Sequence, residues 1–320
     1  MTIQQVKLAS TRKAYGETLV ELGKEDPNIV ALDADLAKST YSILFGQAYK
    51  DRFFYVGVSE QNMMSMAAGL AACGKTVFAS TFAVFATSRD FDQVRINISW
   101  PQMNVKIVAS HGGVSVGEDG ASAQSIEDYA LMSSLPSFRV VVPADAYSVA
   151  KAIRAAAATP GPFYIRTHRP ETPVVYSAAD CPFELGKANV LRDGKDATII
   201  AVGLLVHEAV QAADRLKAVH GVSCRVLDMH TLKPIDEAAV LAASRDTGAI
   251  VTAEEHQVHG GLGATVARVL AEKGDRFTPV DFVALQGYGT SGKYPEIMTH
   301  FHLTADEIEK RVLAILKRKK

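Results

Sequence analysis

The stretch FFYVGVSEQNMMSMAAGLA at residues 53–71 decides how the chain folds. Its first part is rich in aromatic and β-branched residues and predicts a strand ending at Val58, after which Ser59 can cap a helix. Glu60 therefore stands just outside the carboxyl end of a strand, where open α/β sheets bind ligands. Its apolar neighbours would desolvate the carboxyl group, which could then share a proton with a bound base. The plainer interpretation is an acidic residue in the first turn of a helix, favoured by the helix dipole.

Apolar runs of the same kind recur along the whole chain and alternate with helical patterns. We expect strands at 28–35, 53–58, 76–82, 104–110, 139–145 and 162–167, and then at 197–202, 223–229, 249–255 and 280–286. Helices are expected at 61–73, 147–158, 207–219 and 304–318. Near-continuous apolar strands that alternate with helices predict an α/β protein with mostly parallel sheets flanked by helices.

The length of 320 residues suggests two domains. The strand series restarts after the segment 169–186, which contains several prolines and little helical periodicity. We predict a first domain at 1–175, a linker at 176–184 and a second domain at 185–320. Each domain is expected to contain one mostly parallel sheet flanked by helices.

The composition excludes several classes of protein. With 48% hydrophobic and 22% charged residues and a net charge of −1, the chain is neither disordered nor strongly basic. Its three cysteines are widely spaced, which argues against a disulfide framework or a cysteine zinc site and suits a reducing compartment. It shows neither a signal peptide nor an apolar run of membrane-spanning length. We therefore expect a cytoplasmic protein that binds neither nucleic acid nor a membrane.

Two glycine-rich stretches imitate known catalytic motifs. GVSVG at 113–117 matches the nucleophile elbow of hydrolases, but a polar loop follows it where that motif needs a helix. GYGTSG at 287–292 matches a dinucleotide fingerprint, but the chain left after it is too short for the helix, strand and acidic residue required. We interpret both as loops with special backbone angles.

An ordered set of motifs identifies a family resemblance that covers nearly the whole chain. The pyrimidine-binding domain of transketolases is resembled by STRKAYGETL (10–19), DADLAKST (33–40), GVSEQNMMSMAAGLA (57–71), STFAVFATSRDFDQVR (80–95) and SHGGVSVGEDGASAQ (110–124). The transketolase C-terminal domain is resembled by VLDMHTLKPID (226–236) and VTAEEHQVHGGLG (251–263). The resemblance implies the thiamine-diphosphate-binding fold for the first domain. A full transketolase also has a diphosphate-binding domain with a GDG motif, which this chain lacks.

The resemblance therefore implies the C-terminal subunit of a split transketolase. Its partner would be a separate N-terminal subunit that carries the diphosphate-binding domain and the Mg²⁺ ligands, so no metal ligand is expected here. Together they would use thiamine diphosphate to move a two-carbon ketol unit from a ketose, expected to be phosphorylated, to an aldose. An assembly of two copies of each subunit (α2β2) is expected.

The resemblance also carries roles for individual residues. Glu60 matches the glutamate that hydrogen-bonds the aminopyrimidine and activates the cofactor, and Asp35 and Asp119 match aspartates that organise the site and contact sugar hydroxyls, Asp35 on the cofactor side. Phe82 and Phe85 match aromatics that pack on the pyrimidine, and their spacing of three suggests one helical face. The substrate phosphate would be bound by Arg12, Ser39, His111 and Arg169, with His111 also the in-chain catalytic candidate.

Two positions depart from the family pattern. Ala123 replaces a histidine that contacts the donor sugar, and Ser88 replaces a tyrosine of the cofactor pocket. Two alternatives are enzymes built on the same domains: a 1-deoxyxylulose-5-phosphate synthase-like enzyme and a 2-oxo-acid dehydrogenase β-type subunit, over which DADLAKST and GEDGAS favour transketolase. A third alternative, a non-catalytic assembly subunit, is supported only by the two departures, and the retained Glu60 counts against it. In the second domain, the His/Glu cluster at 254–259 could suggest a metal site, but we expect it to cap a helix or to lie at the domain interface.

Overall fold

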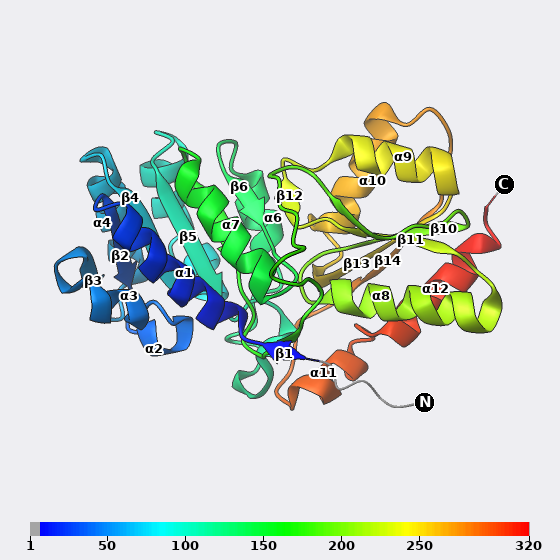
Figure 1. The fold of residues 1–320 in the computed structure, drawn as a ribbon, viewed down its shortest axis with the longest axis horizontal. Coiled ribbons are helices and arrows are strands. Elements are labelled where there is room, and N and C mark those ends of the chain that lie inside the picture. Colours follow the sequence, from blue (N-terminus) through cyan, green and yellow to red (C-terminus); the bar gives the residue numbers. More distant parts are fainter. Residues whose placement is uncertain (1–6, 320) are drawn as a thin grey trace.

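The computed structural model describes residues 7–319, so residues 1–6 of the first predicted domain and Lys320 lie outside it. The chain forms two α/β units side by side, each with its own central sheet and each built mainly from one half of the sequence (Figure 1). The prediction of two domains, each built on a mostly parallel sheet flanked by helices, is confirmed.

The first sheet has seven strands in the order β12-β6-β7-β5-β4-β2-β3. Its parallel members are β2 (Ile29–Asp33), β3 (Phe53–Tyr55), β4 (Thr76–Phe82), β5 (Val105–Ser110), β6 (Arg139–Val141) and β7 (Phe163–Arg166). The edge strand β12 (Thr231–Lys233) is antiparallel and comes from the second half of the chain. A separate two-stranded ladder joins β1 (Leu8–Ala9) to β8 (Thr172–Pro173).

Helices cover both faces of the first sheet. One face packs on α1 (Thr11–Glu25) and α7 (Ala146–Ala158), and the other on α4 (Glu60–Ala72), α6 (Asp128–Ser134) and the π-helix η3 (Val94–Ser99). The shorter helices are α2 (Ala37–Thr40), α3 (Ile43–Ala48), α5 (Phe91–Gln93), the 3-10 helices η1 (Lys50–Arg52) and η4 (Val114–Asp119), and the π-helix η2 (Phe85–Arg89). Apolar residues alternate between the two faces of the strands, which is how one sheet supports two layers of helices.

The second sheet has five strands in the order β14-β13-β10-β11-β9. Four are parallel, namely β10 (Ala197–Ala201), β11 (Cys224–Asp228), β13 (Ile250–Gln257) and β14 (Val280–Leu285), and the edge strand β9 (Asn189–Arg192) is antiparallel. The helices α8 (Leu205–Arg215) and α12 (Ala305–Leu316) cover one face, and α9 (Glu237–Thr247) and α10 (Leu262–Lys273) the other (Figure 1). The π-helix η5 (Leu216–His220) extends α8, and α11 (Tyr294–His300) precedes α12.

All ten predicted strands form, but the four short strands β1, β8, β9 and β12 were not predicted. Three of them have only two or three residues, too few to produce a periodic signal. The predicted linker, residues 176–184, contains neither helix nor strand. The second half of the chain nevertheless adds a strand to the first sheet, because β12 pairs with β6. One apolar cluster includes Met132 from the first half and Leu227 and Leu262 from the second, so the two halves share a core. The exact domain boundaries stay a prediction.

Among the described helices, none has the length and apolarity needed to cross a bilayer.

Candidate functional site

Most of the predicted site residues gather at one edge of the first sheet. Because β2, β3, β4, β5 and β7 are parallel, their carboxyl ends share that edge. The sequence runs outward from β2 to β3 and then returns to β4 on the other side of β2, which creates a topological switch point. The residues at these strand ends or within a few positions after them are Asp35, Glu60, Phe82, His111 and Arg169. The switch point is where such folds bind ligands.

Glu60 is the first residue of α4 and is only 2% exposed. The predicted cap by Ser59 is wrong, because its hydroxyl donates to the Val56 carbonyl (2.7 Å) instead of accepting a helix N–H. β3 also stops at Tyr55, three residues earlier than predicted. The buried Glu60 carboxylate thus lies at an uncapped helix N-terminus.

Sequence reasoning missed the partner of Glu60. The Arg89 guanidinium donates to both Glu60 oxygens, at 2.9 and 3.0 Å, and lies 4.3 Å from the centre of the Phe85 ring. The adjacent Asp90 is fully buried, and neither carboxyl oxygen has a hydrogen-bond partner among the described residues. Burial, together with the Glu60 carboxylate, raises the pKa of Asp90 to about 8. No local pattern could have predicted a contact across 29 residues.

The aromatic residues form a stack beside this carboxylate. Phe82 and Phe85 lie nearly parallel with ring centres 5.8 Å apart, and Phe82 stacks on His111 at 3.7 Å. The expectation of one helical face is wrong, because Phe82 is the last residue of β4 and Phe85 the first of the π-helix η2. The turn between them brings the rings together. Ser88, one of the two departures from the family pattern, lies in the same π-helix and is exposed.

His111 is buried and has a left-handed backbone (φ 59°), which is uncommon outside glycine. Its Nδ1 lies 2.8 Å from the Ser110 hydroxyl. Burial, with Arg12 and Arg169 adding to it, lowers the pKa of His111 to about 3. The imidazole is therefore neutral near pH 7, where it can donate or accept a hydrogen bond but does not act as a cation.

The predicted phosphate-binding residues converge from separate elements. Arg12 in α1 donates to the Ser39 carbonyl (2.7 Å) and the Arg169 carbonyl (2.6 Å). The Arg169 side chain pairs with the exposed Glu118 at 2.9 Å. Two guanidinium groups thus lie next to the buried His111, and an incoming anion would compete with Glu118 for Arg169.

The Asp35 and Asp119 side chains are not fixed in the site by contacts with neighbouring residues. Both are exposed, and neither side chain makes a hydrogen bond with another residue in the range 7–319. The buried aspartate of this region is Asp33, which accepts from the hydroxyls of Thr40 and Ser42, both at 2.8 Å. Burial raises the pKa of Asp33 to about 6. Asp33 was not predicted from the sequence, although DADLAKSTYS (33–42) contains an aspartate followed by residues with hydroxyl groups that could bind it.

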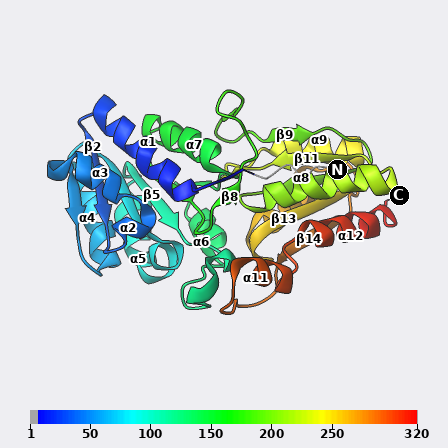
Figure 2. The same ribbon diagram turned by 60° about the horizontal axis from the view of Figure 1, so that its bottom comes forward.

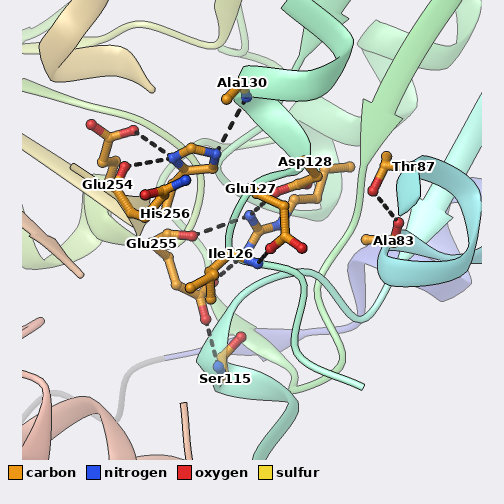
Figure 3. Close-up of polar contacts among 12 residues, drawn as sticks. Ala83, Thr87, Ser115, Ile126, Glu127, Asp128, Ala130, Glu254, Glu255 and His256 are labelled. Atoms are coloured by element: carbon orange, nitrogen blue, oxygen red, sulfur yellow. Dashed lines mark hydrogen bonds and ion pairs between the residues drawn. The ribbon is translucent and has the colours of Figure 1, made fainter. Parts of the chain in front are cut away.

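The acidic cluster of the second domain does not form a metal site. Glu254 accepts the N–H groups of Leu262 and Gly263 at the start of α10, and Glu255 reaches across to the first domain (Figure 3). The predicted capping and interface roles are thus confirmed. Within residues 7–319, no group of three His, Cys, Asp or Glu side chains could hold a metal ion.

The centre of the domain interface is Arg166, which is fully buried at the end of β7. It pairs with Asp128 of its own domain at 3.3 Å and with Glu255 of the second domain at 2.7 Å. Figure 3 shows Asp128 and Glu255, the two carboxylates of this cluster, close together where the two domains meet. Arg166 is therefore held within the protein and lies apart from the open edge that Arg12 and Arg169 line.

Comparisons with known proteins agree with this arrangement. The transketolase pyrimidine-binding domain model matches residues 7–174, and the transketolase C-terminal domain model matches residues 186–308. A Methanocaldococcus jannaschii protein described as a transketolase C-terminal section is 44% identical over 96% of both chains. Human transketolase is 39% identical over 96% of this chain, which spans only 49% of that protein.

Solved structures show the same fold. A structure described as a split gene transketolase, an inactive β4 tetramer, superposes with a TM-score of 0.90 at 46% identity and covers 97% of this chain and 99% of its own. Campylobacter jejuni transketolase shares the fold at a TM-score of 0.81 and 21% identity, with 96% of this chain matching 47% of that one. The chain belongs to the transketolase family and carries its pyrimidine-binding and C-terminal domains.

Proposed function

We propose that this chain is the C-terminal subunit of a two-chain, thiamine-diphosphate-dependent transketolase. The observation that carries the proposal is the buried Glu60 carboxylate beside the Phe82–Phe85 stack at the switch point of the first sheet. A second observation supports it: two arginines and a neutral histidine lie along the same edge. Together they suit an aromatic base at one end and an anionic sugar at the other.

The residues present fit the pyrimidine half of the cofactor. Glu60 offers a carboxyl group for a ring nitrogen, and Phe82 and Phe85 offer aromatic faces for packing. When bound, thiamine diphosphate supplies the carbanion chemistry that breaks and forms carbon–carbon bonds. Glu60 would hold the proton shared with the pyrimidine, and Arg89 would have to loosen its hold on the carboxylate. Mg²⁺ would be bound with the diphosphate by the partner subunit.

The other end of the site would bind the sugar substrate. Arg12 and Arg169 would bind the phosphate, because guanidinium groups match phosphate oxygens in pairs. His111, neutral and buried between them and Phe82, would contact a substrate hydroxyl or a phosphate oxygen. Ser39 and Asp119 would contribute from α2 and from the end of η4. Asp35 would help to organise the cofactor side.

A partner subunit is proposed because half of such a site is missing from this chain. Large hydrophobic side chains are exposed near Glu60: Tyr55 is 50% exposed and Val58 72%, and Met66 lies on the exposed side of α4. Exposed apolar surface of this kind suits a subunit interface. The related split-gene tetramer contains β subunits and is described as inactive, which supports a need for the other subunit. We propose an α2β2 assembly in the cytoplasm.

The first test is calorimetric titration of thiamine diphosphate and Mg²⁺ into the chain, with and without the diphosphate-domain protein from the same source. We expect tight binding only when the partner is present. Tight, Mg²⁺-dependent binding to the lone chain would contradict the split-site proposal. A strict pyruvate donor with release of CO₂ would instead identify a 1-deoxyxylulose-5-phosphate synthase-like or 2-oxo-acid dehydrogenase-type enzyme.

The second test is the variant Glu60→Ala, assayed for ketol transfer in the assembled enzyme. Loss of a group that controls a proton should lower kcat by at least ~100-fold. Glu17→Ala is a matched control, because Glu17 is exposed on α1 and pairs with the exposed Lys13. Full activity of Glu60→Ala would favour an assembly subunit without a catalytic role.

A further inference from the structure

The two glycine-rich stretches that imitate other motifs contact each other across the domain interface. The first belongs to the glycine-rich loop 111–125, and the second is the loop 287–292 between β14 and α11. Ser291 donates its hydroxyl to the Glu118 carbonyl at 2.7 Å, and α11 packs on η4. In Figure 2 the teal loop after β5 lies beside the orange α11.

Gln124 holds the two loops together from inside. It is 3% exposed, and its amide nitrogen lies within reach of three carbonyls: Val114 and Gly117 at 3.3 Å, and Thr290 of the second domain at 3.0 Å. Gly289 lies directly against it, since a Cβ at Gly289 would overlap the Gln124 carboxamide oxygen. A buried amide with such partners fixes the backbone on both sides.

Glu255 holds the same loop from a second direction. It accepts the N–H of Ser115 at 2.5 Å with one oxygen and binds Arg166 with the other at 2.7 Å. Side chains at Gly112 and Gly113 would overlap Arg166 and Glu255, so the loop passes directly over this ion pair. The second domain therefore contacts the glycine-rich loop at Ser115, Glu118 and Gln124.

The glycine-rich loop needs such external contacts. Its backbone has positive φ at His111 (59°), Gly113 (75°), Gly117 (81°) and Gly120 (76°). The left-handed backbone of His111 is sparsely populated and persists only where the surroundings determine it. The glycines adopt positive φ without strain, but they leave the loop backbone with much conformational freedom that other contacts must restrict. The loop carries His111 and Asp119 and places Glu118 on Arg169. Any loosening would thus reach the residues assigned to the substrate.

We infer that the second domain sets substrate affinity by holding the glycine-rich loop, with Gln124 and Ser291 as positioning residues. The inference rests on the proposed function, because it assumes that the loop binds the sugar phosphate. It gives the second domain a part in catalysis beyond assembly. The two glycine-rich stretches are then two halves of one contact.

The test compares two alanine substitutions in one loop. Gly289→Ala displaces Gln124, whereas Gly287→Ala has no described atom within 4 Å of its new Cβ, and neither position has a positive φ. In the chain alone, hydrogen–deuterium exchange of amides 111–125 should be roughly three- to tenfold faster in Gly289→Ala than in Gly287→Ala. In the assembled enzyme, Gly289→Ala should raise KM for the phosphorylated donor by about the same factor, with kcat changed less than about twofold.

A second pair of variants changes the structure less and therefore serves as a check in case Gly289→Ala does not fold. Ser291→Ala removes only the hydroxyl that reaches Glu118, and Thr299→Ala removes a hydroxyl that bonds within α11. Ser291→Ala should show the same two effects in weaker form, and Thr299→Ala neither. Unchanged exchange in both Gly289→Ala and Ser291→Ala would overturn the inference, as would faster exchange without a change in KM. If the wild-type enzyme transfers no ketol unit, the proposed function fails, whereas the exchange result still decides whether the second domain holds the loop.

Discussion

Two arginine–carboxylate pairs in this molecule differ in almost everything around them. Arg166 is fully buried, and the carboxylates of Asp128 and Glu255 satisfy it from two domains. Arg89 is 47% exposed and binds a single carboxylate, that of Glu60. The first pair can change only if the domains separate. The second pair can be opened by a ligand that takes the place of the arginine.

The difference suggests that the Arg166 pair stabilises the fold, whereas the Arg89 pair can open to admit a ligand. Arg166 is the last residue of β7 and binds Glu255 of the second domain, whereas Arg89 is the last residue of η2 and binds Glu60 at the start of α4. Burial makes an ion pair a strict requirement, because each partner would otherwise be left charged without solvent. Exposure leaves a pair weak and exchangeable. The neighbouring Asp90 belongs to neither kind, since it is buried without a hydrogen-bond partner among residues 7–319.

The largest effect is expected from Arg166→Met. Removing the arginine leaves the Asp128 and Glu255 carboxylates buried and unpaired, which should lower the free energy of unfolding by about 3–5 kcal/mol. Urea unfolding followed by circular dichroism measures this change. Arg154→Met is the control, because Arg154 pairs with Glu21 and Glu25 on the surface and should cost less than about 1 kcal/mol. Equal losses for the two variants would show that the buried pair has no special weight.

A pH-dependent effect, smaller than that of Arg166→Met over any single pH unit, is expected from Asp90→Asn. The raised pKa of Asp90, about 8, means that the folded state keeps a proton that the unfolded state releases near pH 4. Stability from this group is therefore retained below pH 4 and is lost as the pH rises toward 8. Asparagine is neutral at every pH. The free energy of unfolding of the variant should therefore rise relative to that of the wild type by at most about 1.4 kcal/mol per pH unit between pH 4 and 8.

The measurement is the difference in unfolding free energy between Asp90→Asn and wild type at pH 5, 6.5 and 8. Asp92→Asn is the control, because Asp92 is an exposed aspartate on the same segment. A difference for Asp90→Asn that does not change with pH would mean that the Asp90 carboxyl is charged and solvated or paired in the folded protein.

The fold could be predicted almost completely from the sequence, and particular residues show why. Runs such as VKIVAS (105–110) are buried on both faces, so their composition alone indicates a parallel strand. The strand β12 could not be found in this way, because its residues pair with β6 some 90 positions away. Pairing over that distance leaves no periodic trace in three residues.

The site was only partly predictable. Strand ends placed Glu60, Phe82 and His111 at one edge, because parallel strands align their carboxyl ends. The contacts of Arg89 with Glu60 and of Glu255 with Ser115 depend on packing between distant segments. The π-helix η2 also overturned the expected helical spacing of Phe82 and Phe85. Chemistry that rests on backbone order was thus predictable, whereas chemistry that rests on side-chain contacts was not.

The smallest effect is expected from Arg89→Met, which completes the comparison. Glu60 would lose its ion pair but keep the α4 N-terminus, whose free N–H groups stabilise a carboxylate. Glu60 is only 3% exposed, but Arg89 is 47% exposed, so its removal opens the Glu60 carboxylate to water. The free energy of unfolding should therefore fall by less than about 1 kcal/mol in the same urea experiment. A loss as large as that of Arg166→Met would show that Arg89 and Glu60 form a structural pair. Glu60 could then be released for a cofactor only at a cost to folding, and the proposed role of this carboxylate would be in conflict with its environment.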